Sequence, residues 1–290
     1  MRRWVMLLCS LLCILAATGC AVGAARAGKN ADAVWQNTTL YLDTPLSVED
    51  AQALAEQQNR QEEPVVFAAW GEQADQTVTD PGLGKSIQTA VISMVGSSEW
   101  MLPGAPVLAP DNTDGCLIGE NTAWKLFGST KVTGSAVGIN GQTYRICGVV
   151  HCPADGVYVQ MGTSAKNSFG QNNVRLARIT LAVNDAQEGS RFLMQYGLSG
   201  KVLRMDYLRN IQTLAELVPG KWSDFEGWKA NIKEWKKQLR HIVKMRKTGM
   251  EYEYAKQCKR RVVDLGAETL FVTAAVVLLS HVLWYTKTKQ

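Results

Sequence analysis

The sequence contains none of the motifs that mark the common catalytic sites. It has three histidines, but it contains neither a nucleophile elbow nor a catalytic-cysteine signature that could form a catalytic site with one of them. The segment Pro81–Ser86 (PGLGKS) is similar to the end of a phosphate-binding loop, but that motif requires a glycine where this chain has Thr79. A turn is therefore the better interpretation of Pro81–Ser86, and we expect no ATPase site in this chain.

The cysteines and histidines also lack the spacing of a metal site. Cys147, His151 and Cys152, with Cys116 as a fourth ligand, match no standard zinc pattern, and an extended chain places Cys147 and Cys152 on opposite faces. Two interpretations of Cys116 and Cys147 remain. They could form a disulfide between adjacent strands if the domain lies outside the cell, or both could be small apolar side chains buried in the core. His151, Asp155 and a nearby serine form no recognisable catalytic set. We expect no catalytic residue, no metal and no cofactor.

The charge balance gives little support to nucleic-acid binding. The net charge of +5 is mild for 290 residues. The segment 229–261 is strongly basic with interleaved aromatic residues, which suits anionic lipid headgroups better than nucleic acid, although a solvated helix face explains it as well. We expect membrane lipid as a partner and no nucleic acid.

An apolar run near the N-terminus predicts a membrane helix over residues 1–25. Arg2 and Arg3 precede it, and the run is long enough to span a bilayer, so a retained transmembrane anchor is the favoured interpretation. Two alternatives remain: a signal peptide cleaved between Ala21 and Ala25, and a lipoprotein signal cleaved before Cys20.

A second apolar run predicts a C-terminal transmembrane helix over residues 265–285. Trp284 and Tyr285 fit an interfacial belt, and Glu268 and His281 lie near enough to the ends to snorkel. No further run is long enough to span, so the body of the chain lies on one side of the membrane.

The basic residues near the two apolar runs indicate on which side of the membrane the body of the chain lies. Arg2 and Arg3 hold the N-terminus in the cytoplasm, which places the body outside. Arg26, Lys29 and the cluster within 256–261 would then lie outside as well, against the positive-inside rule. We favour the cytoplasmic membrane with the core domain facing outside.

The clearest local pattern lies in residues 115–150. It predicts a strand at 116–118, a helix at 120–127 ended by Gly128 as a left-handed cap, and a hairpin turning at Asn140-Gly141. Ala123, Trp124 and Phe127 are expected to lie on one face of this helix.

This stretch resembles the periplasmic core domain of MacB-type ABC transporter permeases, a group that includes the FtsX-like and lipoprotein-release permeases. The residues that carry the resemblance are Ala123, Leu126, Phe127, Gly128, Gly134, Val137, Ile139, Gly141, Tyr144, Ile146, Gly148, Val149 and Val150. A weaker match extends from Thr38 to Arg204. The resemblance implies a two-lobed extracytoplasmic domain that works with a separate cytoplasmic ABC ATPase and permease subunits.

The rest of the body predicts an α+β fold over residues 36–205. A ferredoxin-like split βαβ lobe is expected, with a β-rich lobe inserted at about 96–161, where Pro103, Pro106 and Pro110 mark an irregular start. The predicted strands are 36–43, 64–70, 89–95, 178–183 and 201–205. The predicted helices are 47–60, which Ser47 caps, and 188–196. Residues 77–84 are expected to form a turn.

Residues 217–264 predict a basic amphipathic helical stalk. Ser223 and Glu226 form a capping box at its start, and Gly249 is a point at which it could break. Its apolar seam, expected to pack on a partner helix within the chain or in a homodimer, consists of Phe225, Trp228, Ile232, Trp235, Leu239 and Ile242.

These patterns predict a non-enzymatic, membrane-anchored extracytoplasmic component of an ABC-transporter permease-like system, with a coupling or binding role. Because permeases of that group carry further spans, we expect a split permease or an accessory subunit. The alternative is an anchored surface binding module without an ATPase partner.

Overall fold

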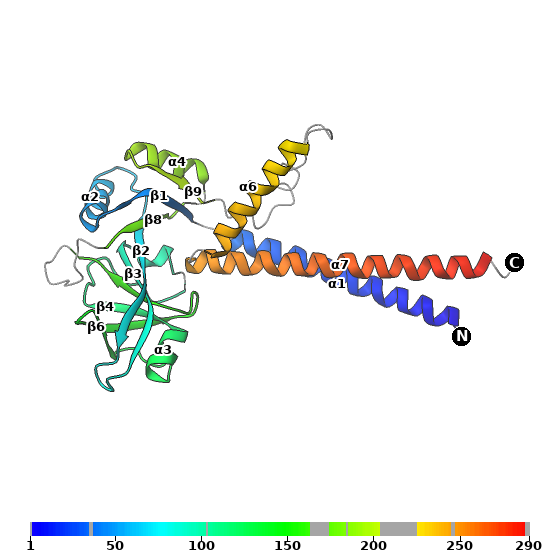
Figure 1. Ribbon diagram of the computed structural model, residues 1–290, viewed down its shortest axis with the longest axis horizontal. Coiled ribbons are helices and arrows are strands. Elements are labelled where there is room, and N and C mark those ends of the chain that lie inside the picture. Colours follow the sequence, from blue (N-terminus) through cyan, green and yellow to red (C-terminus); the bar gives the residue numbers. More distant parts are fainter. Residues whose placement is uncertain are drawn as a thin grey trace. The chain divides into compact units, whose positions relative to one another are not determined.

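The computed structural model describes residues 2–34, 37–102, 104–162, 174–183, 185–203, 225–244 and 247–287 (Figure 1). The chain divides into two units. The helical unit comprises Met1–Val34, Met205–Met245 and Glu253–Gln290, and the core unit comprises Trp35–Arg204 and Arg246–Tyr252.

One lobe of the core unit is an antiparallel sheet with the strand order β2-β8-β1-β9. Its strands are β1 (Thr38–Leu46), β2 (Phe67–Thr79), β8 (Leu176–Leu181) and β9 (Gly200–Val202). Helices α2 (Val48–Asn59) and α4 (Ala186–Gln195) lie over this sheet (Figure 1). The Ser47 hydroxyl and the Asp185 carboxylate accept backbone N–H groups at their first turns, so both helices start at a polar cap.

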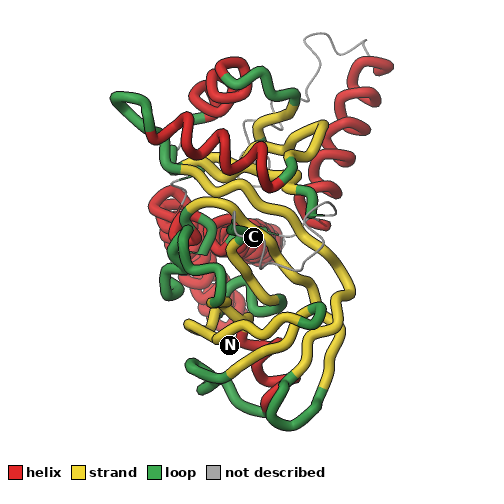
Figure 2. The backbone as a smooth tube through the Cα atoms, turned by 90° about the vertical axis from the view of Figure 1, so that its left-hand side faces the viewer, coloured by secondary structure: helices red, strands yellow, loops and turns green. Residues whose placement is uncertain are grey.

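The second lobe is a closed ring of strands. Pairing runs from β2 to β3 (Ser86–Gly96), then to β7 (Val157–Gln160), β4 (Gly115–Gly119), β6 (Gln142–Val150) and β5 (Ala136–Ile139), and back to β2. Closing the sheet leaves no edge strand that could pair with another chain. Figure 2 shows these strands in yellow. The long strand β2 pairs in both lobes and joins them.

Two apolar clusters hold the core unit together, one on each face of the strands. The first packs α2, α4 and helix α3 (Glu120–Phe127) on the strands and continues inside the ring, where Ile118, Ile146 and Val159 are fully or almost fully buried. The second lies on the other face and contains Trp70, Met101 and Leu108. The segment around the short 3₁₀ helix η1 (Ser98–Trp100), predicted only as irregular, covers it.

The local signals of residues 115–150 are confirmed with one exception. Helix α3 spans Glu120–Phe127 and ends at Gly128, whose φ of 70° is left-handed; Asn140 and Gly141, with φ of 49° and 81°, turn the hairpin between β5 and β6. The expected common face of Ala123, Trp124 and Phe127 is wrong, since Ala123 is buried whereas the Trp124 side chain is 62% exposed. Each helical residue turns by about 100°, so Trp124 lies a quarter turn from buried Ala123.

The other strands and helices confirm the predicted types, with shifted ends. Helix α2 begins after Ser47, as expected. The predicted turn at 77–84 is wrong at its start, because β2 continues to Thr79 and the hairpin turns at Asp80–Gly84, where the Gly84 N–H donates to the Asp80 carbonyl. Strand β7 was not predicted as a separate element. Met205, the expected end of the last strand, lies outside the described residues, and the ferredoxin-like description of the first lobe stays a prediction.

The described residues of the helical unit lie on the helices α1 (Arg2–Val34), α6 (Phe225–Lys244) and α7 (Gly249–Lys287), of which the first turn of α7 belongs to the core unit. By length and composition, Trp4–Ala33 of α1 and Gly249–Val282 of α7 could each cross a membrane. The predicted stalk is therefore two helices, α6 and the first part of α7, and its residues 217–224 lie outside the described residues.

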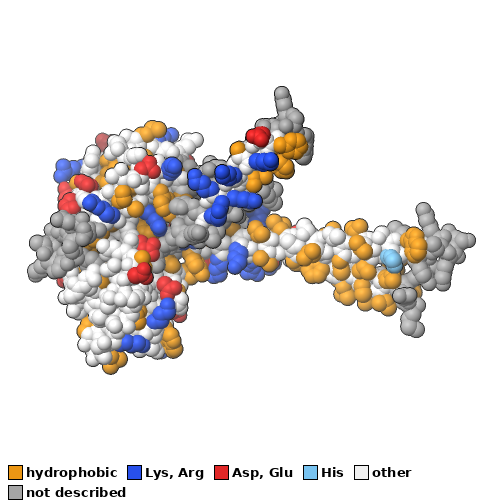
Figure 3. Space-filling model, viewed as in Figure 1, with side chains coloured by type: hydrophobic (Ala, Val, Ile, Leu, Met, Phe, Trp, Pro, Cys, Tyr) orange, Lys and Arg blue, Asp and Glu red, His pale blue; other side chains and the backbone are white. Residues whose placement is uncertain are grey.

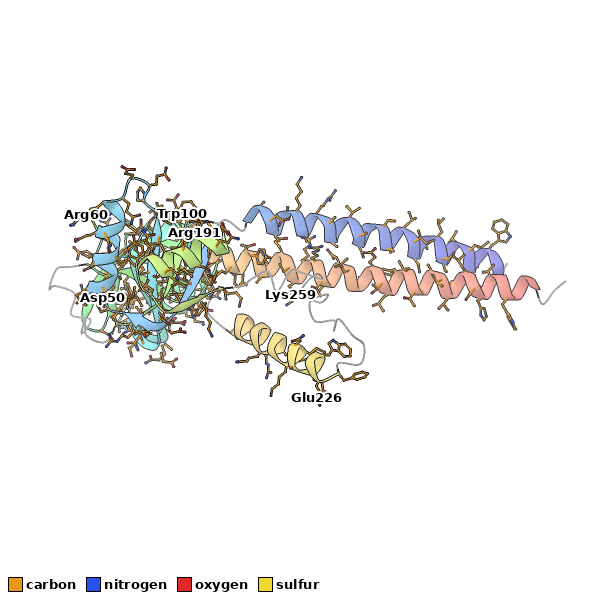
Figure 4. The ribbon with its side chains drawn as sticks, turned by 90° about the horizontal axis from the view of Figure 1, so that it is seen from above. Asp50, Arg60, Trp100, Arg191, Glu226 and Lys259 are labelled. Carbon is orange, nitrogen blue, oxygen red and sulfur yellow. The ribbon has the colours of Figure 1, made fainter. Side chains whose placement is uncertain are left out.

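Helices α1 and α7 run side by side in both ribbon views (Figures 1 and 4). Glycines on α1 permit the close approach. A Cβ atom on Gly23 would lie 2.8 Å from Oδ2 of Asp264, and one on Gly28 would lie 3.4 Å from Nη1 of Arg261. Ala24, Ala27 and Ala31 on the same helix are buried.

Candidate anchoring site

The chain enters the core unit just after α1 and leaves it at the start of α7, and the core binds both points at neighbouring carbonyls. The Asn37 side-chain amide donates to the Trp100 carbonyl at 2.9 Å. The Gly249 N–H donates to the Met101 carbonyl at 2.7 Å. Asn37 and Met101 are both fully buried, so water competes little for these bonds.

The first turn of α7 is fixed by a capping box inside the core unit. The Thr248 N–H donates to Oε2 of Glu251 at 2.9 Å, and the Glu251 N–H donates to the Thr248 hydroxyl at 3.2 Å. This reciprocal pair satisfies two backbone donors that a helix start leaves free. Both side chains are only 1% exposed, so this helix begins in the protein interior.

The Glu251 carboxylate faces the side of the first-lobe sheet opposite to α2 and α4. Side chains alternate along β1 and β8, so Thr39 and Thr180 point away from the helices, whereas Leu40 and Ile179 pack in the cluster beneath them. The Thr39 hydroxyl lies at the carboxylate and 3.4 Å from the Thr180 hydroxyl. The Trp70 indole N–H donates to Thr180 at 3.0 Å, which extends this polar row to β2.

Two cations face the same carboxylate, Arg178 and Lys247. The Arg178 guanidinium stacks between two aromatic rings of the neighbouring strands, 5.0 Å from the Tyr41 centroid and 4.4 Å from the Trp70 centroid. Direct pairing of Arg178 with Tyr41 on one side and with Trp70 on the other produces this arrangement.

Burial dominates the electrostatics of this region. It raises the pKa of Tyr41 well above its ordinary value, which the Arg178 charge only partly opposes. Burial also lowers the pKa of Lys247, against the raising effect of the Glu251 charge. Among the described residues, Oε1 of Glu251 has no hydrogen-bond partner. An unpaired buried polar atom costs roughly 1–3 kcal/mol, so Oε1 offsets part of the stability that the capping box contributes.

We name these residues the anchor cluster: Asn37, Thr39, Arg178, Thr248, Gly249 and Glu251. The cluster binds a helix start and positions no nucleophile beside a base. What it can do is hold α7, and with it the connection to the apolar helices, on the strands of the core.

The residues that suggested a metal or catalytic site are not members of the anchor cluster. Cys116 and Cys147 are free thiols, so the disulfide alternative is not formed; Cys116 is buried inside the ring, where burial raises its pKa, and Cys147 packs against the opposite cluster. His151 Nδ1 lies 3.0 Å from Glu120, and Asp155 pairs with a lysine of α3, both at the surface. Within the described part of the chain, no three His, Cys, Asp or Glu residues are grouped to hold a metal.

The predicted seam residues lie on α6. Phe225 is 62% exposed, and Trp228 and Ile232 are half-buried. The side chains of Trp235, Leu239 and Ile242 lie outside the described residues. A partner for the seam therefore stays a prediction.

Sequence reasoning missed the anchor cluster, although part of it carried a signal. Thr248-x-x-Glu251 ahead of an apolar run is a capping-box pattern of the kind assigned to Ser223 and Glu226. Asn37 and Arg178 carried none, because their roles depend on residues far away in the sequence.

The chain was compared with family models, with curated proteins and with solved structures. The family model described as MacB-like periplasmic core domain matches residues 21–191. Among solved structures, the periplasmic region of MacB from Actinobacillus actinomycetemcomitans has 15% identity and a TM-score of 0.46, over 64% of this chain and 94% of that one. The extracellular domain of the noncanonic ABC-type transporter YknZ from Gram-positive bacteria has 14% identity and a TM-score of 0.42, over 58% of this chain and 100% of that one. No curated protein sequence matches the chain.

The matched residues cover more than half of the chain. Within the core unit they include every described strand except β9. This chain therefore belongs to the family of MacB-like periplasmic core domains of ABC transporter permeases.

Proposed function

We propose that this chain is a membrane-anchored, extracytoplasmic and non-catalytic component of an ABC-permease-like system, in which α7 relays movement between the membrane and the core unit. ABC-type permeases of this family typically work with a cytoplasmic ATPase. Since this chain has no phosphate-binding loop, the ATPase would be a separate subunit.

The observation that carries the proposal is the buried start of α7. Its first turn is held by Gly249 and Glu251 in the core unit, and the same uninterrupted helix continues through the apolar stretch to Lys287. An uninterrupted helix transmits displacement along its axis, because each turn is hydrogen-bonded to the next. A shift of α7 in the membrane would thus reach the Met101 carbonyl and the strands β1 and β8.

Retention of α1 is part of the proposal. The small residues Ala24, Ala27 and Ala31 are buried, and Gly23 and Gly28 lie against α7. A helix that packs on the second apolar helix in this way has a structural role that cleavage at Ala21–Ala25 would remove. The intact mass of the purified protein tests this: a retained helix gives the 31.9 kDa of the full chain, and a cleaved one gives a mass lower by roughly twenty residues.

Co-purification tests the coupling role. A tagged full-length chain, extracted in mild detergent after brief cross-linking, should bring down a cytoplasmic ATP-hydrolysing subunit. The matched control is the same preparation from membranes without the tagged chain. Repeated recovery of the chain with no such subunit would count against the proposal.

Cysteine labelling in intact cells tests the orientation. A membrane-impermeant maleimide should modify half-buried Cys147 before the cells are permeabilised. Modification only after permeabilisation would place the core unit in the cytoplasm.

The second candidate, an anchored binding module without an ATPase, is favoured by a groove in the core unit. The groove has a volume of about 540 Å³ and lies between α2 and the Pro110–Thr113 segment, with Gln52, Val65 and Met161 among its lining residues. Its size and mixed lining suit a peptide segment or a small molecule. A chain that retains a bound ligand but no ATPase would favour this candidate.

A further inference from the structure

The exposed apolar side chains of α1 and α7 form two bands of similar length. On α1 the band runs from Trp4 to Val22, and on α7 it runs from Val262 to Trp284. At 1.5 Å per residue, each band spans about 30 Å, the thickness of a bilayer hydrocarbon core. Each band ends in an exposed tryptophan at the end that is farther from the core unit along the chain: Trp4 is 78% exposed and Trp284 is 62% exposed. Tryptophan is enriched at membrane–water interfaces, which fits these positions.

At the other end of both bands lies a group of six cations. We name it the basic collar: Arg26, Lys29, Lys256, Lys259, Arg260 and Arg261. The contacts of Gly23 with Asp264 and of Gly28 with Arg261 bring the α1 members and the α7 members to the same level of the helix pair. Figure 3 shows Lys and Arg side chains gathered on this part of the helices next to the apolar band, and Figure 4 labels Lys259 there.

Acidic neighbours balance only part of this charge. Lys256 pairs with Glu253 at 3.2 Å, and Arg260 lies 4.0 Å from Asp264. Arg26, Lys29 and Lys259 are exposed, and the described residues offer none of these three an ion pair. Three solvent-facing cations therefore remain next to the apolar bands of the two helices.

We propose that the basic collar binds anionic phospholipid headgroups in the leaflet on the core unit's side of the membrane. Phosphate oxygens accept charge-assisted hydrogen bonds from guanidinium and ammonium groups, and the adjacent apolar bands accommodate the acyl chains. Such binding offsets the cost of placing six cations on the side that the positive-inside rule disfavours. It requires only that α1 and α7 span the membrane, and it holds whether or not an ATPase joins the complex.

The experiment measures lipid composition around the full-length chain. The protein is reconstituted in nanodiscs of neutral phosphatidylcholine with a third phosphatidylglycerol, extracted gently, and its bound lipids are quantified by mass spectrometry. The collar variant carries Arg26→Gln, Lys29→Gln and Lys259→Gln. The control variant carries Lys85→Gln, Lys131→Gln and Lys201→Gln, which removes the same charge from exposed positions of the core unit.

The wild type and the control should carry phosphatidylglycerol above its share in the disc, and the enrichment should fall on addition of 0.5 M salt. Each collar cation contributes about a fivefold preference for the anionic lipid (about 1 kcal/mol), so the collar variant should lose most of the enrichment. Equal enrichment in the two variants, or none in the wild type, overturns the proposal. Loss of enrichment in both variants alike would show that net charge, and not the collar, attracts the lipid. Because the assay contains no ATPase, its failure is distinct from failure of the coupling role.

Discussion

Replacing Glu251 by alanine tests the idea that the start of α7 is fixed in the core unit. The substitution removes the acceptor of the Thr248 N–H and half of the capping box. The Thr248 hydroxyl can still accept the backbone N–H of residue 251, so the variant loses one of the two hydrogen bonds. A buried donor left without its acceptor costs about 1–3 kcal/mol, and the unpaired Oε1 that disappears recovers part of this. We therefore expect the free energy of unfolding to fall by about 1–3 kcal/mol.

Thermal unfolding of the full chain in mild detergent measures this loss. For a unit of this size, 1 kcal/mol corresponds to a Tm change of about 2–4 °C, so Glu251→Ala should lower Tm by about 3–9 °C. The control is Glu253→Ala, two residues further along α7. The Glu253 carboxylate pairs with exposed Lys256. Exposed pairs contribute about 0–1 kcal/mol, and the control should shift Tm by about 2 °C or less.

A second variant separates the cap from the charge. Glutamine also completes a capping box, so Glu251→Gln keeps the hydrogen bonds while it removes the charge that faces Arg178 and Lys247. A Tm close to wild type for Glu251→Gln assigns the effect to the cap. Hydrogen exchange adds a local measurement, since amides of Gly249–Tyr252 should lose protection in Glu251→Ala. A Tm shift below 2 °C with unchanged protection of these amides would refute the buried anchor.

Three further predictions concern the ring of strands. Leu126→Ala should lower the free energy of unfolding by about 2–5 kcal/mol because Leu126 is fully buried, whereas Trp124→Ala, at a 62% exposed position, should change it by about 0.5 kcal/mol or less in denaturant titrations. A thiol reagent should modify Cys147 in the folded protein but Cys116 only after unfolding, as peptide mapping would show. Burial raises the pKa of Tyr144 to about 12, so its contribution to stability is present below pH 10 and is lost as the pH rises towards 12; Tyr144→Phe should flatten that loss in unfolding measured across this range.

The sequence predicted those features that a few neighbouring residues decide. The cap at Ser47, the left-handed Gly128 and the turn at Asn140-Gly141 each depend on contacts within one turn of chain. The resemblance to the MacB-like domain came from the same stretch, and the family match confirms it.

Features that depend on distant residues were not predicted. Closure of the ring requires β3 to pair with β7 and β2 with β5, and neither register can be derived from local periodicity. Arg178 stood in a strand as an ordinary polar residue, although its stacking on Tyr41 and Trp70 follows once the three strands are neighbours. Gly249 was predicted as a point at which the stalk could break, and α7 begins there, but the expected division at residue 264 is absent because α7 continues without interruption to Lys287.

The position of α7 bears on whether the two lobes move separately. Its first turn bonds to Met101, which belongs to the apolar cluster on the outer face of the ring, and it faces Thr39 and Arg178 of the first-lobe sheet. Trp70 of β2 belongs to both sets of contacts, since it packs in that cluster and stacks on Arg178. The first turn of α7 therefore contacts residues of both lobes.

We expect the core unit to move and unfold as one body, because the strand β2 pairs in both lobes and the anchor cluster connects to both. Hydrogen exchange under increasing denaturant tests this, with β9 and β5 as reporters of the two lobes. Amides in both strands should open with the same free energy and the same denaturant dependence, as members of one cooperative unit do. If β5 opened at distinctly lower denaturant than β9, the lobes would be separate units, and a force on α7 could open the groove between α2 and the Pro110–Thr113 segment instead of displacing the whole core.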